Sequence, residues 1–254
     1  MSDHKITTTA TTLHVQDEGE GPPVILLHGL GMSHTVWDEV RFRLPDKRLI
    51  MMDLRGHGQS DAPRGPYTMG GLIKDVEDVC DAVDVQDAVV VGLSLGGMIA
   101  QGLAVKRLDL IRALVLIGTA AKFGQVDAWH ARAQIARGSG MTTLAPTILR
   151  RWNSTDETAK RRLVNTDPEG YAASCEAIAG TDFYTPTSGL RLPTLGLCGD
   201  KDKSTPPDLV RETTDLIPGS EFHLIKGAGH LAPETHGADV AKHLHTFMRG
   251  VGHV

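Results

Sequence analysis

The amino-acid sequence predicts an α/β fold in which a mostly parallel, twisted sheet is flanked by helices and carries a helical insertion. Several apolar runs lack polar alternation, which indicates strands buried on both faces, as in a parallel sheet covered by helices. Stretches of helical periodicity separate these runs, which favours right-handed crossover connections. One long interval contains helical patterns only, and the length of 254 residues fits one domain with such an insertion.

The predicted buried strands are PVILLHG (Pro23–Gly29), RLIMMDLRG (Arg48–Gly56), DAVVVGLS (Asp87–Ser94), IRALVLIGT (Ile111–Thr119) and LPTLGLCGD (Leu192–Asp200). Amphipathic helices are predicted over Leu72–Val83 and Met98–Arg107. The alternating pattern of Lys5–Gly19 predicts an antiparallel hairpin at one edge of the sheet. Strand–helix alternation therefore accounts for most of the chain outside the insertion.

The interval from about Phe123 to Leu190 has no strand-like run. It contains Trp129, Trp152 and two pairs of adjacent arginines within helical patterns. We expect residues 1–122 and 191–254 to form the core domain, and residues 123–190 to form a helical lid, or cap, between two strands of the sheet.

Composition and charge exclude several classes of protein. The chain is 41% hydrophobic and 22% charged, with a net charge of −5 and a pI near 6.2, which does not favour a nucleic-acid surface. No signal-peptide pattern opens the sequence, and no apolar run approaches the roughly 18 residues that span a bilayer. The cysteines (Cys80, Cys175 and Cys198) are odd in number and form no CxxC motif. We expect a cytoplasmic protein that acts on a small molecule, with no nucleic-acid or membrane partner; its oligomeric state stays open.

The stretch VVVGLSLGGM (Val89–Met98) ends a buried strand at a serine that is flanked by glycines. A sharp strand-to-helix turn strains the backbone at Ser94, and glycines two residues before and after it remove steric clashes. Such a turn exposes the serine hydroxyl at the carboxyl end of the sheet, where the following helix directs backbone N–H groups. The pattern predicts a nucleophile elbow with Ser94 as the nucleophile.

A serine nucleophile needs a base, and the base needs an acid partner. Where such an elbow carries the serine, the acid comes after it in the chain and the histidine comes last. GDKDKSTPP follows a predicted strand and offers Asp200 and Asp202, while KGAGHLAPE follows the strand-like run EFHLIK and offers His230. We predict His230 as the base. We favour Asp202 over Asp200 as the acid, because Asp202 lies further into the loop. His243 and His245 are two residues apart on a predicted helix, so they face apart and form no metal site.

An oxyanion hole needs two backbone donors. The amide of Leu95 opens the helix after the elbow, and a turn at His28–Gly29 would direct the amide of Leu30 toward the serine. An alternative is a dinucleotide fingerprint at Gly29-x-Gly31, but its third glycine is missing, so we expect no cofactor. In the polar loop DLRGHGQSD we expect Arg55 to pair with Asp53 and to brace the oxyanion turn.

These motifs resemble the α/β-hydrolase superfamily, whose order HGLG, DLRGHGQSD, GLSLGGM, GDKDKSTPP and GAGHLAPE extends over nearly the whole chain. Within it, the chain is most similar to the 3-oxoadipate enol-lactonases. The stretches that carry this similarity are RGHGQSDAPRGPYTM, GLSLGGMIAQ, GTAAKFGQVDAWHARAQIARGSGM, ILRRW and DPEGYAASCEAIAGTDF. The resemblance implies a triad of Ser94, Asp202 and His230, oxyanion amides at Leu30 and Leu95, and no cofactor or metal.

The sequence also departs from the family pattern. The family often has Asn-Ser where this chain has His28–Gly29, and the residues after Trp152 differ as well. The second difference lies in the lid and leaves the acyl substrate open. Alternatives within the fold are a general carboxylesterase, a cofactor-free perhydrolase similar to the haloperoxidases, and a carbon–carbon bond hydrolase. A ligand-sensing relative with negligible turnover is the alternative from another class.

The substrate of an enol-lactonase carries a free carboxylate, which calls for a cation under the lid. Arg132 follows Trp129 at helical spacing i, i+3, so the two side chains share one face and pair a charge with an apolar wall. We predict Trp129, Arg132 and Trp152 as substrate-binding residues. The alternative is that Arg132 is a solvated surface residue and that Trp129 packs the lid onto the sheet.

Overall fold

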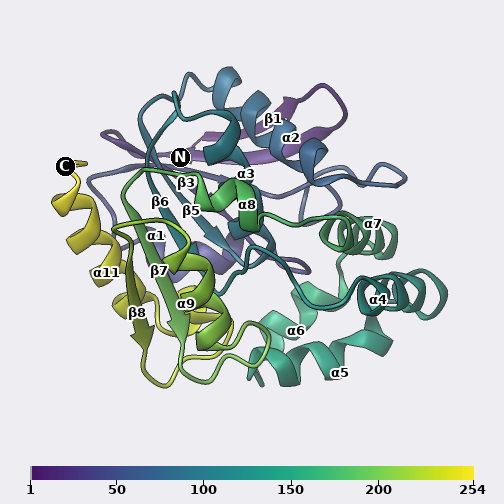
Figure 1. The fold of residues 1–254 in the computed structure, drawn as a ribbon. Coiled ribbons are helices and arrows are strands. Elements are labelled where there is room, and N and C mark those ends of the chain that lie inside the picture. Colours follow the sequence, from purple (N-terminus) through teal and green to yellow (C-terminus); the bar gives the residue numbers. More distant parts are fainter. Residues whose placement is uncertain (1) are drawn as a thin grey trace.

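Eight strands form one sheet in the computed structural model, which describes residues 2–254 (Figure 1). They are β1 (Ser2–Thr7), β2 (Thr12–Glu18), β3 (Pro23–Leu27), β4 (Arg48–Met52), β5 (Ala88–Leu93), β6 (Ile111–Ile117), β7 (Thr194–Gly199) and β8 (Glu221–Ile225). Their order across the sheet is β1-β2-β4-β3-β5-β6-β7-β8. The strands from β4 to β8 in this order are parallel, whereas β1 and β2 are antiparallel to their neighbours.

The predicted strands and the edge hairpin are confirmed. Every residue of β5 and of β7 is buried, as their continuous apolar runs indicated. Each predicted run extends past the end of its strand, because its last residues form the loop at the carboxyl end of the sheet. Those loops carry the polar motifs.

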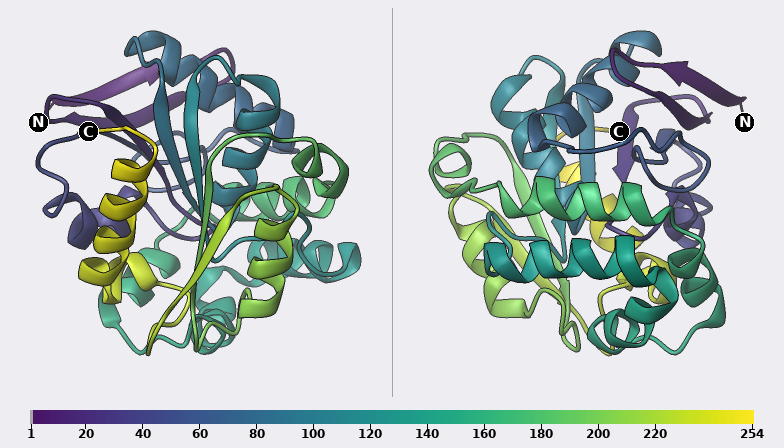
Figure 2. Two further views of the ribbon diagram at one scale, coloured as in Figure 1. Left: turned by 60° about the vertical axis from the view of Figure 1, so that its left-hand side comes forward. Right: turned by 90° about the vertical axis from the view of Figure 1, so that its right-hand side faces the viewer.

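The helices are η1 (a 3₁₀ helix, His34–Trp37), α1 (Asp38–Arg41), α2 (Met69–Ala82), α3 (Leu95–Lys106), α4 (Val126–Ser139), α5 (Met141–Trp152), α6 (Glu157–Val164), α7 (Pro168–Ala179), α8 (Tyr184–Ser188), α9 (Pro207–Asp215), α10 (Ala232–Thr235) and α11 (Gly237–Gly250). Helices α1 and α11 cover one face of the sheet, and α2, α3 and α9 cover the other (Figures 1 and 2). The sheet is thus the middle of three layers.

Helix α3 differs from the amphipathic helix that was predicted over Met98–Arg107. All of its residues from Leu95 to Ala104 are buried, because α3 lies between the sheet on one side and α2 and α8 on the other. Polar residues occur there only where a partner exists: the buried Gln101 amide donates to the Gly97 carbonyl at 3.1 Å and accepts from Thr187 Oγ1 at 2.9 Å. The helix behind Ser94 is therefore fixed on several sides.

Helices α4 to α7 form a separate helical group between β6 and β7, beyond the carboxyl ends of the strands (Figure 1). Helices α4 and α7 run side by side in this group (Figure 2). The short α8 packs against α3 of the core instead. The four-helix group therefore covers the edge of the sheet at which Ser94 lies.

Among residues 2–254, the helices are either too short or too polar to cross a bilayer.

The three cysteines are free and buried, and burial raises the pKa of the Cys80 and Cys175 thiols to about 12. These side chains therefore stay uncharged and pack as small apolar groups.

Candidate active site

Ser94 lies between β5 and α3 with φ of 55° and ψ of −115°, a backbone conformation that non-glycine residues rarely adopt. Such strain costs on the order of 1–3 kcal/mol and persists only where the surroundings enforce it. Here the Ser94 amide donates to the Ile117 carbonyl at 2.9 Å, and Thr119 Oγ1 donates to the Ser94 carbonyl at 2.6 Å. Neighbouring β6 and the loop that follows it thus hold the elbow at both its amide and its carbonyl.

The glycines around Ser94 are required by close backbone approach. A Cβ atom on Gly92 would collide with the backbone of Gly96, and one on Gly96 would collide with the Leu27 carbonyl. The turn can therefore pack against the end of β3 only if both residues lack side chains. This is the strained turn that GLSLG predicted.

The two predicted oxyanion donors belong to segments adjacent to Ser94. Leu95 is the first residue of α3, so its amide has no carbonyl partner within the helix. Leu30 follows Gly29, and a Cβ atom on Gly29 would lie only 3.1 Å from the Cβ of Ser94. The turn that contains Leu30 is therefore in direct contact with the serine.

His230 and Asp202 form a buried pair. The Nδ1 atom of His230 lies 2.7 Å from Oδ2 of Asp202, and both side chains are 1% exposed. Burial alone would raise the pKa of Asp202, but the charge and the hydrogen bond of His230 and the donors of Thr205 hold it below its ordinary value. An ionised Asp202 requires a proton on Nδ1 of His230, which leaves Nε2 free to act as a base.

Thr205 completes the setting of the acid, although sequence reasoning gave it no role. Its hydroxyl donates to Oδ2 of Asp202 at 2.7 Å, and the amides of Ser204 and Thr205 donate to Oδ1 at 2.7 and 3.0 Å. With the bond from His230, Asp202 therefore accepts four hydrogen bonds. The signal for this arrangement was an aspartate followed by Ser-Thr two and three residues later, which is typical of a side chain that caps its own turn.

Asp200 lies at the other end of this loop and is exposed. Its Oδ1 accepts from the Gly227 amide at 2.7 Å, so it links the loop after β7 to the loop after β8. The structure therefore brings Asp202, and not Asp200, together with His230.

Gly118 lies against the acid–base pair. It follows β6, the strand that lies between β5 and β7, and has φ of 48°. A Cβ atom there would lie 3.2 Å from Oδ2 of Asp202 and 3.3 Å from Nδ1 of His230. The missing side chain therefore leaves room for the Asp202–His230 pair.

Ser94 opens into a cavity of about 420 Å³. Its apolar wall includes Phe123 and Trp129, and three cations line it: Arg132, Arg151 and Lys203. None of these three forms an ion pair within residues 2–254. Burial and the nearby charge of Arg132 lower the pKa of Arg151. The three cations make the cavity electrostatically suited to an anionic group.

The predicted substrate-binding residues therefore separate into two kinds. Trp129 and Arg132 line the cavity, and the guanidinium of Arg132 lies 4.8 Å from the centre of the Trp129 ring. Trp152 is 4% exposed and lies against His230, with ring centres 6.3 Å apart and planes inclined by 24°. The expectation that Trp152 binds substrate gains no support from this placement. Arg151 and Lys203 were not predicted, although Arg151 belongs to one of the arginine pairs.

His28 fixes the oxyanion turn to the loop after β4. It is fully buried; its Nδ1 contacts the Gly29 carbonyl at 2.7 Å, and its Nε2 accepts from the Leu54 amide at 2.9 Å. Burial, assisted by the nearby His57, lowers the pKa of His28 to about 3. The neutral ring is therefore a structural link between two loops, with one donor and one acceptor.

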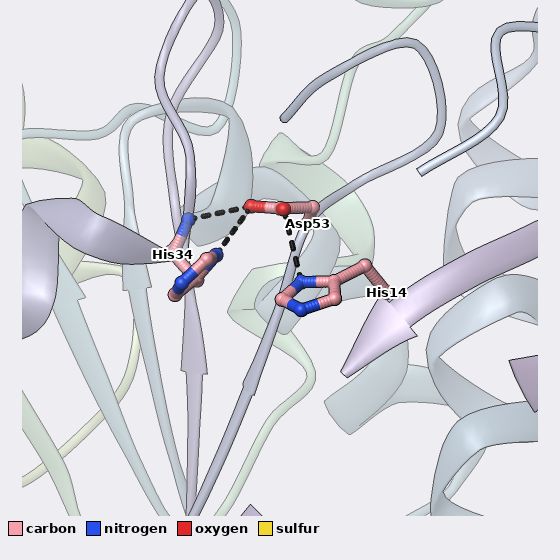
Figure 3. A group of neighbouring side chains, drawn as sticks. All are labelled: His14, His34 and Asp53. Atoms are coloured by element: carbon pink, nitrogen blue, oxygen red, sulfur yellow. Dashed lines mark hydrogen bonds and ion pairs between the residues drawn. The ribbon is translucent and has the colours of Figure 1, made fainter. Parts of the chain in front are cut away.

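The expected pairing of Arg55 with Asp53 is wrong. Arg55 instead pairs with the buried Asp75 of α2, with Nη2 at 2.6 Å from Oδ1. Asp53 pairs with His14 and His34, as Figure 3 shows. The sequence could not reveal this, because His14 lies on β2, which only the sheet topology brings next to β4.

Asp53, His14 and His34 offer metal-ligating atoms within 4.8 Å of one another (Figure 3). Hydrogen bonds account for this cluster: Oδ1 of Asp53 accepts from the amide and Nδ1 of His34, and Oδ2 accepts from Nδ1 of His14 and the Gln59 amide. Burial alone would raise the pKa of Asp53, but these donors hold it well below its usual range. All acceptor positions of the carboxylate are therefore used to fix the loop after the oxyanion turn.

We expect replacement of His28 by asparagine to reduce the loss of stability in acid. Above pH 6.5 His28 is neutral in both the folded and the unfolded chain. Between pH 6.5 and about 3, only the unfolded chain binds a proton at this residue. The free energy of unfolding of the wild type should therefore fall by up to about 1.4 kcal/mol per pH unit at this histidine. Urea denaturation from pH 4 to 7.5 should give a shallower slope for His28→Asn. Replacement of the exposed His4 serves as the control, and equal slopes in all three proteins would contradict the assignment.

Comparison with known proteins gives the same picture as the geometry. Residues 24–243 match the Alpha/beta hydrolase family. The chain is 32% identical over 198 residues to 3-oxoadipate enol-lactonase 2 of Acinetobacter baylyi, which covers 74% of each chain. Among solved structures, it is similar to the enol-lactonase from Burkholderia xenovorans LB400, with a TM-score of 0.91, 32% identity and coverage of 95% of this chain and 98% of the other. It is also similar to a thermophilic esterase from Thermogutta terrifontis, described with malate bound, with a TM-score of 0.92, 30% identity and full coverage of both chains.

Proposed function

The chain belongs to the Alpha/beta hydrolase family as an ester hydrolase, and from this premise we propose that it opens an enol-lactone of the 3-oxoadipate type through a Ser94–His230–Asp202 triad. The observation that carries the proposal is a strained serine that lines the same cavity as three cations, in a chain that also pairs a buried histidine with a carboxylate. The enol-lactonase relatives add the substrate class.

In the proposed mechanism, Nε2 of His230 takes the proton of Ser94 as its hydroxyl attacks the lactone carbonyl. Asp202 keeps the imidazole in the required tautomer and stabilises the imidazolium that forms. The amides of Leu30 and Leu95 bind the oxyanion; loss of one such donor costs about 3–4 kcal/mol of transition-state stabilisation. Collapse of the intermediate breaks the ring C–O bond, and the imidazolium of His230 gives its proton to the leaving enol oxygen, which stays tethered to the acyl group. Neutral His230 then takes a proton from the water that attacks the acyl-enzyme, and returns it to Ser94 as the acid is released. No cofactor takes part in this sequence.

Within the segment 123–190, we assign helices α4 to α7 the role of a lid that supplies part of the substrate-binding surface. Trp129 and Arg132 come from α4 and Arg151 from α5, and they line the same cavity as Ser94. A free carboxylate on the acyl group would meet the guanidinium groups of Arg132 and Arg151, while Trp129 would pack against the ring. That an esterase with 30% identity is described with malate, a dicarboxylate, supports an anionic ligand class.

A general carboxylesterase is the second candidate, because a solved relative with 30% identity is described as an esterase and a serine triad can attack other esters that reach it. The two candidate functions differ in whether the substrate needs a cation in the cavity. A neutral ester gains nothing from three cations that lack ion pairs, whereas a carboxylated lactone does.

We expect Arg132→Ala and Arg151→Ala each to raise the KM for 3-oxoadipate enol-lactone by about tenfold or more, because a charge-assisted hydrogen bond is lost. The KM for p-nitrophenyl acetate should stay within about twofold, since that ester carries no charge for these cations to bind. Steady-state kinetics on both substrates measures the difference.

Arg150→Ala is the matched control, because Arg150 is exposed beside Arg151 and does not line the cavity. Equal losses on both substrates would indicate a packing role for the cavity arginines. An intact protein that hydrolyses the neutral ester but not the lactone would refute the enol-lactonase proposal and favour the general esterase.

A further inference from the structure

The end of α5 is bonded to both loops that carry the acid–base pair. The Arg151 carbonyl accepts from the Lys203 amide at 3.1 Å, and the Trp152 carbonyl accepts from the His230 amide at 2.9 Å. Carbonyls in the last turn of a helix have no partner within it, so they are free to accept from outside. A Cβ atom on Gly229 would also collide with the Trp152 carbonyl. This end of the helical segment is thus in tight contact with the residues around His230.

Arg162, in the adjoining helix α6, links the same region to the other side of the site. Its Nη2 lies 2.6 Å from Oε2 of Glu234 and its Nη1 lies 3.3 Å from Oε1, which is a two-point ion pair. Glu234 is on α10, four residues after His230. Nη1 also lies 3.3 Å from Oγ1 of Thr35, on η1 five residues after Leu30. One guanidinium therefore joins the segment after the base to the segment after the oxyanion turn.

The burial of this contact distinguishes it from an ordinary surface ion pair. The side chain of Arg162 is 10% exposed and that of Glu234 is 20% exposed. The next residue, Leu163, packs on the oxyanion turn itself: a Cβ atom on Gly31 would lie 2.6 Å from Cδ1 of Leu163. Helix α6 is therefore in contact with the turn of Leu30 at the point where Arg162 holds α10.

We propose that Arg162 is a positioning residue that clamps α6 between η1 and α10. It thereby fixes the position of the Leu30 amide relative to His230. The inference rests on the proposed function of these two residues. It follows from the geometry because His230 and Leu30 lie on separate loops, and Arg162 of α6 contacts the segments that follow both. A displacement of about 1 Å between catalytic groups can cost about a hundredfold in rate.

The test replaces Arg162 by methionine, which keeps much of the stem and removes the donors. Arg161→Met is the matched control, because Arg161 is the exposed neighbour on the same helix. We expect Arg162→Met to lower kcat for p-nitrophenyl acetate by about tenfold to a hundredfold with a KM change below about threefold. Rates are expressed per active site titrated with a fluorophosphonate, so that unfolded protein is not counted. Arg162→Lys should recover part of kcat, and so should the charge exchange Arg162→Glu with Glu234→Arg.

Hydrogen exchange provides a second measurement that does not depend on turnover. In Arg162→Met, amides of residues 157–164 and 231–236 should exchange faster than in the wild type and in Arg161→Met. Unchanged exchange would overturn the clamp. Faster exchange with unchanged kcat would overturn the positioning role. If Arg162→Met does not fold, Glu234→Gln replaces it in both the kinetic and the exchange measurements. A wild type that reacts with no ester and no fluorophosphonate would refute the proposed function instead, while the exchange measurement would still test the clamp.

Discussion

Ser94→Ala and His230→Ala should each lower kcat/KM on p-nitrophenyl acetate by about 10⁵- to 10⁶-fold, the largest effects expected in this chain. In the proposed mechanism the serine supplies the nucleophile and the histidine its base, so removal of either abolishes the same step. The double variant should therefore be no worse than either single one, because the effects of groups that act as a unit do not add.

His223→Ala is the matched control for the histidine. His223 lies on β8 with 45% of its side chain exposed, and its charge partner is Glu221 on the same strand. Activity should change little in this variant. A Ser94→Ala protein that keeps more than a hundredth of wild-type activity would show that another nucleophile carries the reaction.

The strands and the elbow were predictable because they depend on short-range constraints. A buried parallel strand needs a continuous apolar run, and the turn at Ser94 needs glycines at fixed offsets, so both leave a local pattern. The burial of α3 could not be predicted from such a local pattern. Its sequence determines that it is a helix, but whether a second layer covers it depends on α2 and α8.

The contacts that support the site were harder to predict from the sequence, because they join residues that are distant in it. Asp53 is bound by His14 and His34 from two different elements, and a local reading paired it wrongly with Arg55. Trp152 illustrates the same difficulty: its residue type is typical of a substrate wall, yet its carbonyl and ring contact His230. Composition and spacing identify candidate reactive groups and local turns such as that of Asp202 and Thr205, whereas the partners from distant elements emerge only from the packing.

The acid assignment leads to the second large effect: Asp202→Asn should lower kcat by about 10⁴-fold, whereas Asp200→Asn should leave it within about twofold. Asp202 accepts at all four of its acceptor positions, two from backbone amides on Oδ1 and two from Thr205 and His230 on Oδ2. An amide side chain cannot match this set, because one of its two ends is a donor.

Each orientation of the substituted amide has its own cost. If the NH₂ group occupies the place of Oδ2, the histidine must take the other tautomer, and its Nε2 then carries a proton and cannot act as a base. If the NH₂ group faces the amides of Ser204 and Thr205, buried donors oppose one another and the loop is destabilised. The first orientation predicts a near-normal melting temperature with a low kcat, and the second predicts losses in both. Thermal unfolding measured beside kcat separates the two, and a crippled Asp200→Asn beside an active Asp202→Asn would reverse the assignment of the acid.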